Sequence, residues 1–160
     1  MGDRDRDESG RARNLRPRDA LGRPLPHGSA GVSRIPDDLM LSAADSLRYA
    51  QELLDEGLAF NAHEVLEAAW KNAPHAERAM WQALAQLAVG ITHIQRGNSA
   101  GAQSVLRRAA DGLISSRENS AHGVDVDVLV VHAETLIADL VRGADISPQR
   151  LRPRLHTSRP

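Results

Sequence analysis

The chain has 160 residues, which is enough for one domain of ordinary size, and its formal net charge is −1. It contains no cysteine, which excludes disulfide frameworks, thiolate nucleophiles and Cys-ligated metal sites, so any metal site would use His and carboxylate ligands. Only two Trp, one Tyr and one Phe are present, and Ala and Leu dominate the apolar residues. This composition favours closely packed helices over β-strands, and we predict an all-α fold.

Charge is unevenly distributed along the chain. Residues 1–38 carry eight Arg against seven acidic residues, residues 39–147 carry eight basic against fourteen acidic residues, and residues 148–160 carry four Arg and no acid. Pro and Gly interrupt the first 38 residues, which show no apolar periodicity. We predict a disordered or loosely docked Arg/Pro-rich leader over 1–38, a helical domain over 39–145, and a basic disordered tail over 146–160.

We expect neither a signal peptide nor a membrane-spanning segment in this sequence. The first residues are charged and lack an apolar core, and the most apolar stretch, Trp81 to Ile94, is too short to span a bilayer. We therefore expect a soluble cytoplasmic protein with no membrane partner. Nucleic acid is disfavoured as a partner because no aromatic residue lies among the arginines of the C-terminal segment. A protein partner or a second copy of the chain is left open.

Apolar residues recur at three- and four-residue spacing through the middle of the chain, and this spacing predicts five helices. The first begins near Leu39, with Ser42 as its N-cap, and ends near Gly57. The others are expected over residues 60–72, 75–96, 99–116 and 126–143. An internal repeat at an offset of 40 residues places Gly57 on Gly97, as in tetratricopeptide-like helical hairpins. Two such hairpins and a closing helix form the predicted compact bundle.

Polar residues concentrate on the second and third of these helices. His63 and Glu67 lie one turn apart on the second helix. The third helix is apolar almost all round, yet Gln82, Gln86 and His93 fall within about 40° of one another in helical projection. An unpaired buried amide or imidazole costs on the order of 1–3 kcal/mol, so we expect this polar stripe to be paired with His63 and Glu67.

Three interpretations of this cluster remain open. It forms a closed hydrogen-bond network, or it binds a divalent cation such as zinc, manganese or iron, or it lines a pocket for a small polar ligand, nucleotide or peptide end. In the second interpretation a metal-bound water would carry out hydrolysis. The spacing H-E-x-x-E differs from the zincin helix H-E-x-x-H because a Glu replaces the second His.

The motifs FNAHEVLEAAW (60–70), ALAQLAVGITHIQRGN (83–98) and GAQSVLRRA (101–109) closely resemble the DUF309 family of small helical proteins. The resemblance covers roughly residues 45–115, and the segment 11–28 looks like the leader of actinobacterial members. The family is of unknown function and has been labelled a predicted metal-dependent hydrolase. The resemblance implies a helical bundle. From the first two of these motifs it singles out His63, Glu64, Glu67, Trp70, Gln86, His93, Arg96 and Asn98.

The leading hypothesis is therefore a DUF309-like metal-dependent hydrolase, in which His63, Glu67 and His93 are the metal ligands and Glu64 is the catalytic base. The residues expected to line the pocket or support the ligands are Trp70, Gln82, Gln86, Arg96 and Asn98. The alternatives are a non-enzymatic helical interaction module with a structural polar network, and nucleic-acid contact through the basic tails. The segment from Leu21 to Gly28 is a candidate strap across the domain.

Overall fold

Five α-helices form the domain in the computed structural model, which describes residues 18–25, 31, 35–36 and 38–157. Single turns of 3₁₀-helix lie between or after them, and the described residues contain no strand, only an isolated bridge between Arg18 and Pro24. The predicted all-α fold is confirmed. In chain order the elements are α1 (Ala43–Asp55), α2 (Ala59–Asn72), η1 (His75–Glu77), α3 (Arg78–Gln95), α4 (Ser99–Ser115), η2 (Arg117–Asn119), α5 (Val126–Arg142) and η3 (Pro148–Leu151).

Local sequence signals set the helix boundaries. Ser42 caps α1 by accepting a hydrogen bond from the backbone N–H of Asp45 at 3.1 Å, and Asn98 caps α4 by accepting one from Gly101 at 3.0 Å. The turns after α1 and α3 use Gly57 (φ +79°) and Gly97 (φ +74°), a left-handed conformation that other residues rarely adopt. The glycines of the internal repeat therefore occupy equivalent turns of two helical hairpins.

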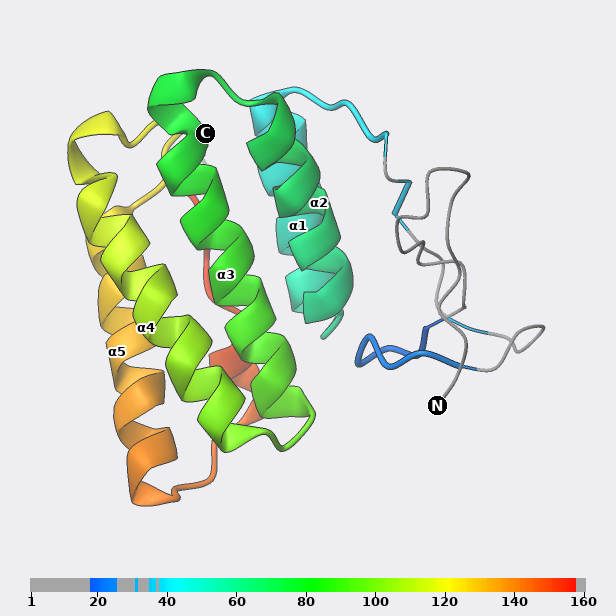
Figure 1. The fold of residues 1–160 in the computed structure, drawn as a ribbon, viewed down its shortest axis with the longest axis vertical. Coiled ribbons are helices and arrows are strands. Elements are labelled where there is room, and N and C mark those ends of the chain that lie inside the picture. Colours follow the sequence, from blue (N-terminus) through cyan, green and yellow to red (C-terminus); the bar gives the residue numbers. More distant parts are fainter. Residues whose placement is uncertain (1–17, 26–30, 32–34, 37, 158–160) are drawn as a thin grey trace, which may run out of the picture.

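The helices are arranged in two layers, with each helix packed on the next in the chain. Figure 1 shows α2, α3 and α4 side by side, with α1 behind α2 and α5 behind α4. As predicted, α3 is the central helix: it packs against both α2 and α4 and buries Trp81, Leu84, Leu87 and Ile91.

Small residues bring α3 and α4 into close contact. A Cβ atom on Gly90 would lie 2.5 Å from Cδ2 of Leu106, a side chain that is fully buried. A second contact of this kind joins Gly112 of α4 to Ala83 of α3, where a Cβ would lie 3.0 Å from the alanine Cβ. The distance between the two helices is therefore set by the absence of a side chain at Gly90.

The C-terminal segment differs from the predicted disordered tail. Within α1, Gln51 donates a hydrogen bond to the Pro153 carbonyl at 3.0 Å and accepts one from the Leu155 N–H at 2.8 Å. Leu155 is only 1% exposed, and the segment runs behind α3 between α1 and α5 (Figure 1). Asp139 on α5 binds Arg150 of the same segment. The prediction was wrong for residues 146–157 because these residues fill the space between two helices that do not pack extensively on each other.

Part of the leader is docked on the domain. The Arg96 Nε atom donates to the Leu21 carbonyl at 2.8 Å, and the guanidinium of Arg18 lies 4.9 Å from the centre of the Phe60 ring. Gly22 is buried against that ring, and Ile35 is buried in the core. Residues 18–25 thus make the contacts expected of a strap, while residues 26–28 of the predicted strap lie outside the described residues.

Among the described residues, no helix has both the length and the apolar character needed to cross a membrane.

The Gln51 bonds predict a measurable role for the C-terminal segment. Substituting Gln51→Ala removes both bonds to residues 153 and 155 and leaves buried backbone groups unpaired, so we expect a loss of about 1–3 kcal/mol in the free energy of unfolding. Faster proteolytic cleavage after residue 145 should accompany it. Urea unfolding and limited proteolysis measure both effects, with the exposed neighbour Glu52→Ala as control. Unchanged stability and unchanged cleavage in the Gln51 variant would contradict this account of the segment.

Candidate functional site

His63 and Glu67 form a direct pair on α2. The Nε2 atom of His63 lies 2.9 Å from Oε2 of Glu67, and its Nδ1 atom lies 3.3 Å from the Phe60 carbonyl oxygen. Both ring nitrogens therefore face acceptors, which fixes the orientation of the imidazole. The other carboxylate oxygen of Glu67, Oε1, lies 3.5 Å from the Lys71 ammonium, whose side chain is exposed. The i,i+4 spacing of these residues on one helix accounts for both contacts.

The pair keeps the Glu67 carboxylate ionised. The hydrogen bond from His63 is the largest cause that lowers the pKa of Glu67 below its ordinary value, and the charges of His63 and Lys71 lower it further. Partial burial acts in the opposite direction and does not reverse the shift. At neutral pH this site presents a negative charge whose two oxygens contact the half-buried His63 and the exposed Lys71.

The pair opens into a pocket between α2 and α3 with a volume of about 170 Å³, here called the α2–α3 pocket. Ala85 and Val89 contribute the apolar part of its wall. The polar part comes from five residues that the sequence singled out, which are His63, Glu67, Trp70, Gln82 and Gln86.

The polar stripe of α3 lies at the surface and not in the core. Gln82 is exposed and Gln86 is half-buried, whereas both were expected to be buried. The apolar pattern of α3 reflects its contacts with α2 and with α4, and these contacts leave one side of the helix open to solvent (Figure 1). The two amides therefore need no protein partner and remain available to a ligand.

His93 lies outside the pocket, contrary to the expected pairing with His63 and Glu67. Its Nδ1 atom is 3.2 Å from Nδ2 of Asn98, and burial is the main cause that lowers the pKa of His93. Gln82 and His93 share a direction in helical projection, but eleven residues correspond to about 16 Å of rise along the axis. A helical projection shows only direction around the axis and omits this rise. Gln82 and His93 therefore lie far apart although they share a direction.

The other predicted pocket residues have different positions. Arg96 holds the leader through the Leu21 carbonyl, and Asn98 caps α4. Glu64 is half-buried and is not among the residues that line the pocket. Among the described residues, no group of three or more His, Asp or Glu side chains is placed to hold a metal ion. The three expected metal ligands are thus only partly brought together, with His63 and Glu67 in contact and His93 apart.

A family model described as a domain of unknown function, DUF309, matches residues 47–105, from α1 into α4. Over these residues the chain is similar to the DUF309 family. The α2–α3 pocket lies entirely inside the matched segment, and α5 and the C-terminal segment lie beyond it. The comparisons with curated proteins and with solved structures found no match.

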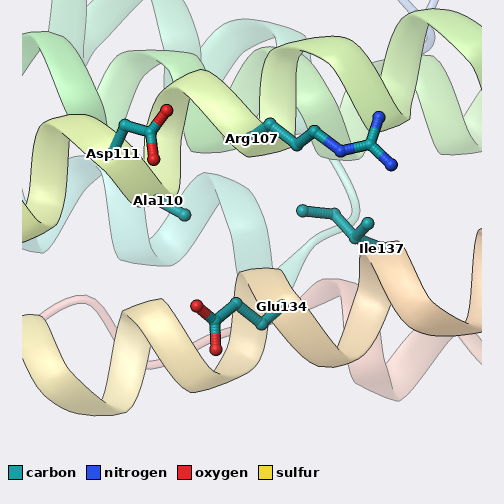
Figure 2. Close-up of a pocket in the computed structure, with 5 residues that line it drawn as sticks. All are labelled: Arg107, Ala110, Asp111, Glu134 and Ile137. Atoms are coloured by element: carbon teal, nitrogen blue, oxygen red, sulfur yellow. The ribbon is translucent and has the colours of Figure 1, made fainter.

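Sequence reasoning missed two parts of the molecule that bear on function. One is Lys71, whose i,i+4 spacing from Glu67 could have indicated it as a partner of the carboxylate. The other is a second pocket between α4 and α5, outside the segment that the family model matches, which Figure 2 shows. Its residues are Arg107, Ala110, Asp111, Glu134 and Ile137, and their exposed charges carry no recognisable motif.

The lowered pKa of Glu67 predicts a specific dependence of stability on pH. Since the folded-state pKa lies below the ordinary value of 4.5, the stabilisation is fully present above the unfolded-state pKa and is lost as pH falls through the folded-state pKa. At pH 6 we expect the free energy of unfolding of wild type to exceed that of Glu67→Gln by a few tenths of a kcal/mol. The difference is small because the carboxylate is partly exposed to solvent. Urea midpoints from about pH 6 to pH 3 should show this difference vanish in acid.

The matched control is Glu52→Gln, an exposed carboxylate on α1. Its difference from wild type should stay near zero throughout. A Glu67→Gln difference that does not change with pH would show that the pair with His63 does not govern the ionisation of Glu67.

Proposed function

We propose that the α2–α3 pocket binds a cationic group, the ammonium of a lysine side chain or of a chain N-terminus, presented by a protein partner. In this proposal the DUF309 domain is an interaction module. The supporting observation is the unequal pairing of the two oxygens of Glu67, one with His63 and one with the exposed Lys71.

The unequal pairing leaves room for an incoming cation. The contact between Oε2 of Glu67 and His63 is short, at 2.9 Å, and partly shielded from solvent, so Oε2 already has a partner. The contact with Lys71 is long at 3.5 Å and joins exposed side chains, and such pairs contribute on the order of 0–1 kcal/mol. An ammonium from a partner can therefore replace Lys71 at Oε1 at small cost, and Lys71 itself marks where a cation sits.

The remaining wall of the pocket suits an ammonium group. The side-chain amides of Gln82 and Gln86 each carry a carbonyl oxygen that can accept hydrogen bonds from an ammonium N–H. Trp70 contributes an aromatic ring, and the guanidinium of Arg78 already lies 5.3 Å from its centre. Aromatic faces attract cations by about 0.5–1 kcal/mol at exposed sites.

The size of the pocket favours a side chain over a free metabolite. Pockets for drug-sized ligands usually span about 300–1,000 Å³, whereas the α2–α3 pocket measures about 170 Å³. A single lysine side chain or a chain end is the kind of group that such a volume accommodates. The partner would supply the rest of its binding energy from contacts outside the pocket.

A metal-dependent hydrolase is the second candidate, and the contact between His63 and Glu67 favours it because the two side chains are adjacent potential ligands. A further ligand would have to come from Gln82 or Gln86 across the pocket, and Glu64, which does not line the pocket, would have to turn towards it to act as the base on a metal-bound water. This candidate requires the carboxylate to exchange His63 for the metal. The cationic-group proposal leaves the observed pair intact.

The proposal is tested with n-butylammonium as a probe, monitored by NMR of the Trp70 indole and of the Gln82 and Gln86 side-chain amides. We expect saturable shifts at all three groups with a Kd in the millimolar range, as is usual for a ligand of few atoms. Lys71→Ala should tighten binding by removing the competing cation, and Glu67→Gln should abolish it. Equal binding of the neutral analogue n-butanol would contradict the proposal.

The same samples separate the two candidates. If the untagged protein contains near-stoichiometric zinc, manganese or iron that is lost in His63→Ala, the hydrolase replaces the interaction module. If it contains none and butylammonium binds as described, the interaction module stands.

A further inference from the structure

A second pocket, separate from the site of the proposed function, lies between α4 and α5 and is here called the α4–α5 groove. Its volume is about 300 Å³. Figure 2 shows the carboxylates of Asp111 on α4 and Glu134 on α5 toward one end, and Arg107 toward the other. Ala110 and Ile137 form the apolar floor between them.

The charged residues of the groove are exposed and form no ion pair within the described part of the chain. Charges near one end of these two helices do pair, since Arg117 of η2 and Asp127 of α5 lie 2.8 Å apart. Arg107 and Asp111 are four residues apart on α4, yet they do not pair. The groove therefore has a negative end and a positive end, both open to an incoming molecule.

Exposed apolar side chains flank the groove on the same two helices. They are Val131 (62% exposed) and Val141 (62%) on α5 and Ile114 (43%) on α4. Val131 is three residues from Glu134, and Ile114 is three residues from Asp111, so both lie at the acidic end of the groove. Scattered exposed apolar residues are ordinary, but a set that borders a charged groove indicates an interaction surface.

We propose that a second copy of this chain docks on this face about a two-fold axis. A two-fold rotation about the floor of the groove places the acidic end of one copy over the basic end of the other, so that Arg107 meets Glu134 and Asp111 of its partner copy in two equivalent contacts. Surfaces that carry both charges at opposite ends of an apolar centre are self-complementary in this way. The valines and Ile114 then pack between the two copies.

The size of the face sets the strength of the association. Two neighbouring helices of 17 residues each are about 25 Å long and together about 20 Å wide, so each copy can contribute on the order of 500 Å². This lies at the lower limit of specific interfaces. We expect a reversible dimer, and the test below covers dissociation constants in the micromolar range.

Sedimentation velocity of the full chain over about 5 to 500 µM tests the proposal, since this range brackets micromolar association. Wild type should shift from monomer to dimer across it. Arg107→Glu and Glu134→Arg should each remain monomeric, because each places like charges opposite one another. An equimolar mixture of these two variants should dimerise again, because the added carboxylate of the first faces the added guanidinium of the second.

Arg108→Glu is the matched control, since Arg108 is the exposed neighbour of Arg107 and does not line the groove. It should dimerise like wild type. Circular dichroism melting verifies that every variant is folded. A wild type that stays monomeric at the highest concentration, or a dimer that both single variants leave intact, would overturn the proposal and leave the groove to a different partner.

Discussion

The close approach of α3 and α4 at Gly90 is the constraint on which the rest of the structure depends. Leu106 is fully buried at the position that a side chain on residue 90 would occupy, so the two helix axes can approach only because that side chain is absent. The contact fixes α3 relative to α4 in both distance and register. Since α3 also packs on α2, the same contact determines which residues of α3 face the α2–α3 pocket.

This arrangement separates two surfaces of different character. The α2–α3 pocket lies within the segment that the DUF309 model matches, and His63, Glu67 and Gln86 are among its lining residues. The α4–α5 groove takes two of its five lining residues from α5, and all five lie beyond the matched segment. Ligand binding at the pocket would thus be a property of the domain, while self-association would be a property added by the C-terminal part of this chain.

Much of the fold could be predicted because its signals are local. Apolar spacing, the cap at Ser42 and the turn glycines all act within a few residues, and each is where the sequence placed it. The docking of the C-terminal segment could not be predicted, because it depends on Gln51 pairing with residues about a hundred positions away. The basic composition of that segment pointed to disorder and hid the two apolar anchors, Pro153 and Leu155.

The candidate site was predicted in part for the same reason. His63 and Glu67 are neighbours on one helix, so their contact follows from spacing alone. The separation of His93 follows from the axial rise of α3, which a helical projection does not represent. The exposure of Gln82 depends on which side of α3 the other helices leave uncovered, and this is a property of the assembled bundle.

The bundle depends on the close packing of α3 and α4, which the lack of a side chain at residue 90 allows. The most direct measurement compares the free energy of unfolding of Gly90→Ala with that of Gly112→Ala. Alanine gains about 1 kcal/mol in helix propensity at an unconstrained site, but overpacking a fixed core costs about 1–3 kcal/mol. The account predicts that Gly90→Ala is destabilised, and more strongly than Gly112→Ala, where the nearest atom is less crowded. A Gly90→Ala protein as stable as wild type, or more stable, would contradict it.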